Sequence, residues 1–190
     1  MNTPAHLLLG TAAFGNPARR YTTAAALIGS LAPDISLYLL VGIALFIQQI
    51  SPQVVFGEIY FSDEWQQVFA VDNSFLIWGA VLALGLWWRR HWLIAFCAAG
   101  LLHLATDFAL HNEDARMQFW PLTDWMFRSP FSYWDRRFGA AWIGPLEVVV
   151  SGLMLVILWR RYPGWWLRIL FLGLMALELG GSVPVEMALH

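Results

Sequence analysis

Three polar residues near the middle of the chain, His103, Asp107 and His111, follow one another at intervals of four. On an α-helix this spacing places the three side chains on one face. They lie at the end of a strongly apolar run that begins near His91. Imidazole and carboxylate groups inside such a run are costly unless they are paired or bound to a metal. The spacing therefore predicts either an internal ion pair or part of a metal site.

The composition places these residues inside a membrane protein. The 190 residues are 59% hydrophobic and 13% charged, and the mean hydropathy is +0.57. Soluble domains usually carry about a quarter charged residues. We therefore expect an all-α, polytopic membrane helical bundle, with residues 1–190 as a single integral membrane domain in contact with the lipid bilayer. The net charge of −2 gives no indication of nucleic-acid binding.

Apolar runs predict about five spanning helices and one shorter helix. The short helix, over 2–15, has about a dozen apolar residues, so we expect it to be re-entrant or interfacial. Pro33-Asp34 interrupts the first span, and a carboxylate at that depth needs a partner. The spans are predicted at 22–47, 74–88, 91–111, 140–159 and 165–183.

Two long segments, 48–71 and 112–139, are predicted to be loops on one side of the membrane. The pairs Arg19-Arg20, Arg89-Arg90 and Arg160-Arg161 fall in alternate short turns, which places them together on the opposite side. The positive-inside rule makes that side cytoplasmic and both long loops extracytoplasmic. The first loop is expected to form a short amphipathic helix along the membrane surface, and the second, rich in aromatic residues, to act as a lid.

These elements support the hypothesis of a divalent metal site. A re-entrant helix would bring an early histidine to the outer end of the bundle, and the Pro33 break would expose the carboxylate beside it. The candidate metal ligands are His6, Asp34, His103 and Asp107. Such a nitrogen and oxygen set fits zinc, with manganese as the alternative. Asp72 and His111 are the candidate catalytic acid–base groups beside an activated water.

Each candidate also has a structural interpretation. His103 and Asp107 can simply pair with each other, since they are four residues apart. His111 can interact with the dipole at its helix end. Asp72 can be a helix N-cap and nothing more.

The order of these motifs resembles a bacterial inner-membrane family of metal-dependent hydrolases, which is distantly similar to zinc-dependent phospholipase C. The matching residues are His6, Pro33-Asp34, and His103 with Asp107. The resemblance extends over residues 2–125. It implies a multi-pass hydrolase of the bacterial inner (plasma) membrane, acting at the outer face on a phosphoester or lipid-derived substrate.

The chain departs from this family at two places. Ser36 stands where the family has a second aspartate. The family stretch His-Arg-Gly-x-Thr-His-Ser corresponds here to residues 69–75, which contain no histidine, so that Asp72 is the residue left to replace a ligand. Both departures bear on catalysis more than on the fold.

Three stretches, 71–75, 119–123 and 132–135, resemble a narrower group of short bacterial membrane proteins. Some of these carry a cobalamin-biosynthesis label. The sequence has no amidotransferase cysteine, nucleotide-binding loop or soluble domain that would support that chemistry.

Two non-hydrolytic functions stay open. A non-catalytic accessory or assembly protein would use the His/Asp cluster as structure and bind a membrane-protein partner or a second copy of itself; the small residues over 24–32 favour close helix contact. A small transporter would use Asp34, Glu147 and Glu178 as a carboxylate relay. The absence of an internal repeat counts against the common transporter designs.

Overall fold

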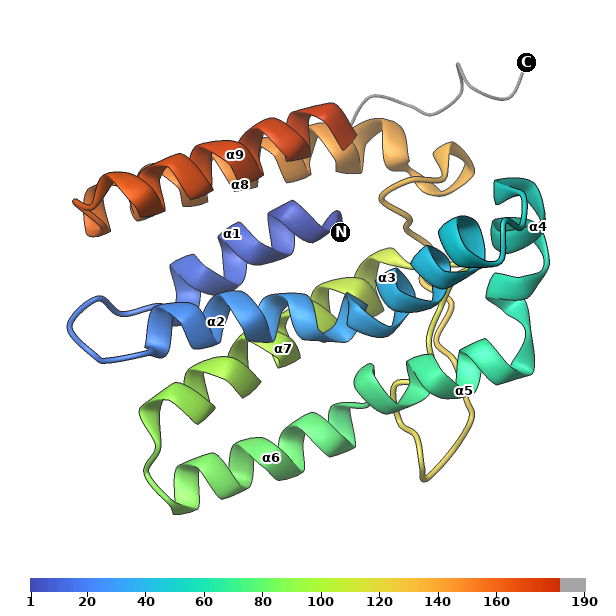
Figure 1. Cartoon of the computed structure of the whole chain (residues 1–190), viewed down its shortest axis with the longest axis horizontal. Coiled ribbons are helices and arrows are strands. Elements are labelled where there is room, and N and C mark those ends of the chain that lie inside the picture. Colours follow the sequence, from blue (N-terminus) through green and yellow to red (C-terminus); the bar gives the residue numbers. More distant parts are fainter. Residues whose placement is uncertain (182–190) are drawn as a thin grey trace.

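The computed structural model describes residues 1–181, and every regular element in that range is a helix, as predicted (Figure 1). The longer helices are α1 (Thr3–Phe14), α2 (Thr22–Leu31), α3 (Ile35–Gly42), α5 (Asp63–Asp72), α6 (Phe75–Trp87), α7 (His91–Leu110), α8 (Ala140–Arg161) and α9 (Trp165–Gly181). The short ones are η1 (Ala32–Asp34), η2 (Ile43–Ile47), α4 (Pro52–Gly57), η3 (Ile59–Phe61) and η4 (Arg136–Phe138).

Four helical segments are long and apolar enough to cross a membrane, which indicates membrane association. They are Thr22–Ile47, Asp63–Trp87, His91–Leu110 and Ala140–Arg161. The fifth predicted span corresponds to α9, which has 17 residues, and positions 182 and 183 of that prediction lie outside the described residues. A total of five crossings stays a prediction, as does the side on which each loop lies.

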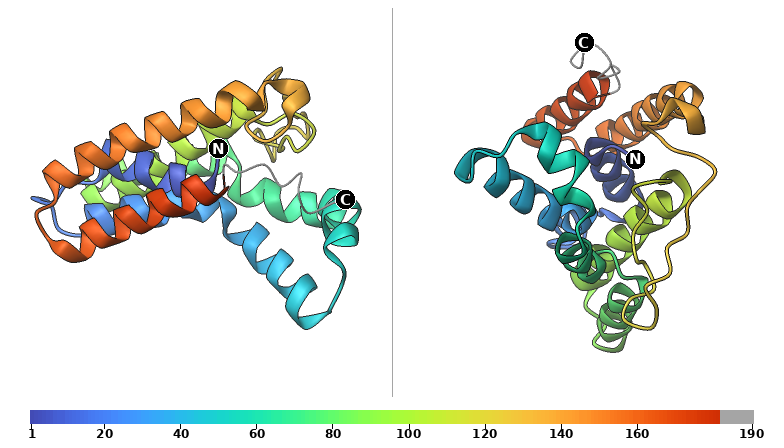
Figure 2. Two further views of the ribbon diagram at one scale, coloured as in Figure 1. Left: turned by 90° about the horizontal axis from the view of Figure 1, so that it is seen from above. Right: turned by 90° about the vertical axis from the view of Figure 1, so that its right-hand side faces the viewer.

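The predicted interruption at Pro33 is present. Proline has no backbone N–H to donate, and the chain forms the short 3₁₀ turn η1 between α2 and α3. Figure 2 shows α3 diverging from the bundle beyond this turn. The break leaves Asp34 at the point where the helix changes direction, beside the N-terminal end of α1.

The segment 48–71 is more helical than a loop. Ser62 caps α5, since its side chain accepts a hydrogen bond from the Trp65 backbone N–H, and Asp63 and Glu64 occupy the first turn. Negative charge at a helix N-terminus is stabilising, so this acidic stretch begins a helix that runs to Asp72. Residues 112–139 are irregular apart from η4, as predicted.

The short N-terminal helix lies inside the bundle rather than beside it. α1 packs against α2, α7, α8 and α9, and Figure 1 shows it between α2 and the α8–α9 pair. Leu8 and Ala12 of α1 belong to a buried apolar cluster with Leu158 and Phe171. This packing buries both faces of α1, including His6. The relation of α1 to the membrane surface stays a prediction.

α2 and α7 approach closely because small residues line their contact. A Cβ atom at Gly29 would overlap the backbone carbonyl of Phe96, and one at Gly10 of α1 would overlap the Ser30 side chain. Small residues let helix backbones come together in membrane proteins. The contact places Ser30 and Asp34 opposite the buried face of α7.

Candidate metal centre

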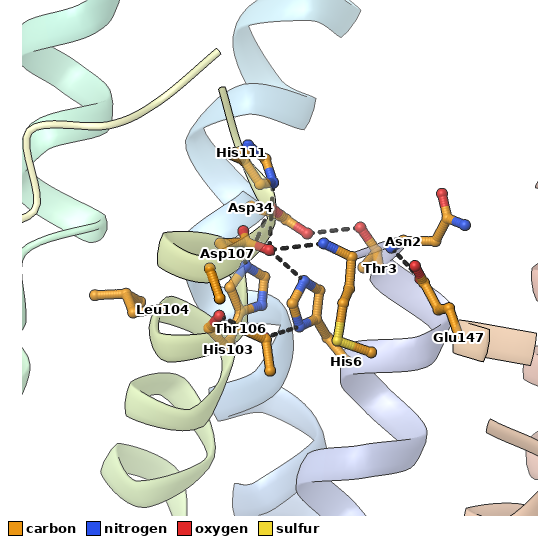
Figure 3. A network of polar contacts seen from close by, with 12 residues as sticks. Asn2, Thr3, His6, Asp34, His103, Leu104, Thr106, Asp107, His111 and Glu147 are labelled. Carbon is orange, nitrogen blue, oxygen red and sulfur yellow. Dashed lines mark hydrogen bonds and ion pairs between the residues drawn. The ribbon is translucent and has the colours of Figure 1, made fainter. Parts of the chain in front are cut away.

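α1, η1 and α7 bring the four predicted ligands together at one end of the bundle (Figure 3). His6 Nε2 lies 2.9 Å from Asp107 Oδ1, and His103 Nε2 lies 3.1 Å from Asp107 Oδ2. His103 Nε2 also lies 3.5 Å from an oxygen of Asp34. Both imidazole side chains are completely buried.

His6, His103 and Asp107 form a group that could hold a metal ion. Each offers one ligand atom, and these atoms lie within 4.8 Å of one another. Bonds of about 2.1 Å to a tetrahedral ion separate neighbouring ligand atoms by about 3.4 Å. The observed separations of 2.9 and 3.1 Å between the histidine nitrogens and the carboxylate are slightly shorter than that spacing, so a small outward shift of these side chains would admit an ion.

The hydrogen bonds of the Nδ1 atoms fix the orientation of both rings. His103 Nδ1 lies 2.7 Å from the backbone carbonyl oxygen of Ser30, which can only accept, so Nδ1 donates. His6 Nδ1 lies 3.3 Å from Thr106 Oγ1, and the Thr106 hydroxyl donates to backbone carbonyls of its own helix. That leaves the Thr106 oxygen to accept from His6. In a neutral imidazole with a proton on Nδ1, Nε2 carries the lone pair.

The Nε2 atoms therefore face carboxylate oxygens with a lone pair if the ring is neutral, or with an N–H group if the ring is protonated. Among residues 1–181, Nε2 of His6, His103 and His111 makes no hydrogen bond of regular geometry, although each is within 3.5 Å of a carboxylate. A lone pair that faces a carboxylate oxygen in a buried site is repelled unless a proton or a metal cation lies between the two atoms. The residues present fit a divalent cation held by histidine nitrogen and aspartate oxygen.

His111 joins this group from the end of α7. Its Nε2 lies 3.3 Å from Asp107 Oδ1 and its Nδ1 lies 2.9 Å from Asp114 Oδ2. Burial lowers the pKa of His111, but the carboxylates of Asp107 and Asp114 outweigh burial and raise it above the ordinary value. Burial likewise raises the pKa of Asp114, and the His111 hydrogen bond and charge outweigh it and lower that pKa.

Asp72 does not lie with the other candidates. It is the last residue of α5, and its Oδ1 accepts a hydrogen bond from the Asn73 side chain at 3.0 Å. The N-cap of α6 is Ser74, whose hydroxyl accepts from the Ile77 N–H. The structural interpretation of Asp72 as the cap is therefore wrong. In the described part of the chain Asp72 is outside both the ligand group and the pocket beside it.

A pocket of about 230 Å³ lies beside the cluster, and several of its lining residues were not among the predicted site residues. Its walls include Asp107, His111, Asp114, Arg116, Tyr60 and Tyr133. Arg116 is only 7% exposed, stacks 4.1 Å from the Phe69 ring centre, and has an Nη1 atom without a hydrogen-bond partner in the described chain. Burial raises the pKa of Tyr60 to about 12, so its phenol stays neutral and can donate.

The first turn of α1 contacts the carboxylates that the transporter hypothesis invokes. Thr3 donates to Asp34 at 2.6 Å. The Asn2 backbone N–H donates to Glu147 at 2.5 Å, and its side-chain amide lies 3.3 Å from an oxygen of Glu178. The three carboxylates thus contact neighbouring residues at the start of α1, Thr3 and the N-cap Asn2. A relay function for them stays a prediction.

Comparison with protein-family models, with curated proteins and with solved structures finds no match to this chain. The resemblance to metal-dependent hydrolases therefore stays a prediction. The geometry of the cluster and its pocket is the basis for the proposed function.

Proposed function

We propose that this protein is a membrane-embedded, metal-dependent hydrolase that acts on a phosphoester or lipid-derived anionic substrate. The observation that supports the proposal most strongly is the convergence of buried Nε2 atoms on Asp107, with the Nδ1 atoms of His6 and His103 held by oxygen acceptors. Such oxygen partners orient histidine ligands in metalloproteins.

Each residue has a distinct part in the proposed site. His6, His103 and Asp107 hold the ion, with Asp34 as a further ligand at 3.5 Å from His103. When bound, a divalent ion supplies Lewis acidity and lowers the pKa of a water molecule. His111, paired with Asp114, borders the pocket and is placed to accept or return a proton.

The substrate class is inferred from Arg116. A buried guanidinium with a free N–H group in a small pocket favours an anionic group, and arginine matches the oxygens of a phosphate. Neutral phenols of Tyr60 and Tyr133 line the same pocket and add hydrogen-bond donors without adding negative charge.

Zinc is the metal that we propose, with manganese as the alternative, since two imidazoles and carboxylates suit zinc. We also propose a bacterial inner-membrane location with the segments 48–71 and 112–139 outside. The α1–α2, α6–α7 and α8–α9 turns, which contain the arginine pairs, lie at the same end of the bundle (Figure 1), and this supports the orientation.

The test is hydrolysis of a chromogenic phosphodiester and of phospholipid vesicles by the purified protein. Activity is expected to disappear after chelation, to return with zinc, and to be absent in Asp107→Asn. Activity that is unaffected by chelation or by Asp107→Asn contradicts the proposal.

A non-catalytic accessory protein is the second candidate. One observation favours it: the Met1 amino group lies 2.9 Å from Asp107 Oδ1 and neutralises that carboxylate without an ion. This candidate predicts a metal-free, well-folded protein that co-purifies in mild detergent with a membrane-protein partner or a second copy of itself.

A further inference from the structure

The end of the bundle opposite the metal centre carries positive charge without any carboxylate. Seven of the eleven arginines fall in or beside its three turns: Arg19, Arg20, Arg89, Arg90, Arg160, Arg161 and Arg168. No Asp or Glu occurs in residues 1–33, 73–106 or 148–177, the ranges that contain these turns. Figures 1 and 2 show the α1–α2 and α8–α9 turns side by side at this end.

A cavity of about 550 Å³ opens among these turns. It is lined by residues from the end of α1 and the following turn, from the start of α7, and from the end of α8. Its lining includes three basic side chains, Arg19, His91 and Arg161, and no acidic one. The charge that gathers here comes from segments far apart in the sequence, so the fold creates the site.

Two of the three side chains contact each other. Arg19 Nη1 donates a hydrogen bond to His91 Nδ1 at 3.2 Å, since a guanidinium has no acceptor. Arg161 donates through Nη1 to the backbone carbonyls of Ala12 at 2.6 Å and Gly15 at 3.0 Å. These bonds fix the guanidinium at the end of α1 and leave its other N–H groups for a further acceptor.

No ion pair with a carboxylate neutralises Arg19 or Arg161 within residues 1–181. An anion between these side chains would supply the missing negative charge and accept several charged hydrogen bonds at once. Planar guanidinium groups match the oxygens of a phosphate especially well.

The remaining lining adds an apolar wall, which includes Phe14, Ile94 and Ala95. A cavity lined by both basic and apolar side chains suits an amphipathic anion. Basic pockets between membrane helices bind lipid headgroups in this way.

We propose that this cavity binds a phosphate group through Arg19, His91 and Arg161, carried by an anionic phospholipid or present as free phosphate. The site is separate from the metal centre and does not depend on the proposed hydrolase activity.

The test measures ligand binding to the purified full-length protein in neutral detergent. Phosphatidylglycerol is titrated by native mass spectrometry, and sodium phosphate is titrated by thermal shift against sodium chloride at equal ionic strength. The variants are Arg19→Gln, His91→Gln and, as matched control, Arg20→Gln, whose guanidinium stacks on its neighbour Tyr21 and is not part of the cavity lining.

We expect the wild type to bind at least one of the two probes saturably. Arg19→Gln should weaken that binding about tenfold, as loss of a charged hydrogen bond predicts, and Arg20→Gln should change it less than about twofold. Binding of phosphatidylglycerol alone identifies a lipid headgroup, and binding of inorganic phosphate identifies a soluble source.

Two results overturn the proposal. One is that neither probe binds the wild type. The other is that Arg19→Gln and Arg20→Gln weaken binding equally, because diffuse surface charge would then account for it. If Arg19→Gln does not fold, the same comparison is made between His91→Gln and Arg20→Gln.

Discussion

The imidazole rings of His6 and His103 stack face to face, with ring centroids 3.6 Å apart and 13° between the planes. Two protonated imidazoles in this arrangement would repel strongly in a buried site. Both rings instead direct Nε2 toward the same carboxylate, that of Asp107. The stack therefore disfavours two charged rings, and a single positive charge shared with Asp107, either a proton or a metal ion, satisfies the arrangement.

The hydroxyl of Thr106 is expected to tune metal affinity through His6. Thr106→Val removes the acceptor for His6 Nδ1 and preserves the side-chain shape. Loss of such a partner typically weakens metal binding about 10- to 100-fold. Competition with a chromogenic chelator measures the change. Thr11→Val is the matched control, since Thr11 is a buried helical threonine whose hydroxyl has no partner within residues 1–181, and it should leave the affinity unchanged.

Arg116 is expected to bind the anionic part of the substrate. Arg116→Gln removes the charge from the pocket beside the cluster and should lower kcat/KM for a phosphodiester about 10- to 100-fold, mainly through KM. Steady-state kinetics with the chromogenic substrate checks this. Arg128→Gln, on an exposed part of the same segment, is the control. Equal kinetics for the two variants would remove Arg116 from the site.

The close contact of α2 with α7 is expected to depend on Gly29. Gly29→Ala places a methyl group against the Phe96 carbonyl, which is backbone and cannot turn aside. The expected loss is about 2 kcal/mol of unfolding free energy, together with weaker metal binding, because Ser30 and Asp34 follow on the same segment. Thermal unfolding in detergent measures it. Gly79→Ala, which meets nothing within 4 Å, should be neutral or stabilising.

The pair His111–Asp114 predicts a specific sensitivity to acid in the metal-free protein. His111 lowers the pKa of Asp114 in the folded state. A lowered folded-state pKa means that the stabilisation is complete above the unfolded value of about 3.9 and is lost as pH falls through the folded value. Unfolding measured from pH 6 down to about pH 3 should show a smaller loss of stability in Asp114→Asn than in wild type. Asp124→Asn, at an exposed position, should follow the wild type.

Much of the architecture could be predicted because it depends on local pattern. The short N-terminal helix predicted over 2–15 is Thr3–Phe14, and the stripe His103–Asp107 lies on the buried face of His91–Leu110 as its spacing indicates. The Pro33 break follows from the missing N–H of proline. These features need no knowledge of tertiary contacts.

The rest of the site depends on contacts that no periodicity reveals. Asp114 and Arg116 lie in an irregular segment, so nothing in their spacing indicates that they reach the cluster. His103 is held by a backbone carbonyl of Ser30, and backbone groups are invisible to residue patterns. Asp72, Asn73 and Ser74 are all good helix-capping residues. Which of them caps α6 depends on where α5 ends, and because α5 runs to Asp72, the cap is Ser74.

The most direct test of the account is the metal content of the purified protein. Elemental analysis after affinity purification without added metal should find stoichiometric zinc or manganese in the wild type and almost none in His103→Ala or Asp107→Ala. His91→Ala, an exposed histidine at the other end of the same helix, should retain the metal. A well-folded wild type that contains no metal and takes up none on incubation with zinc or manganese would contradict the account.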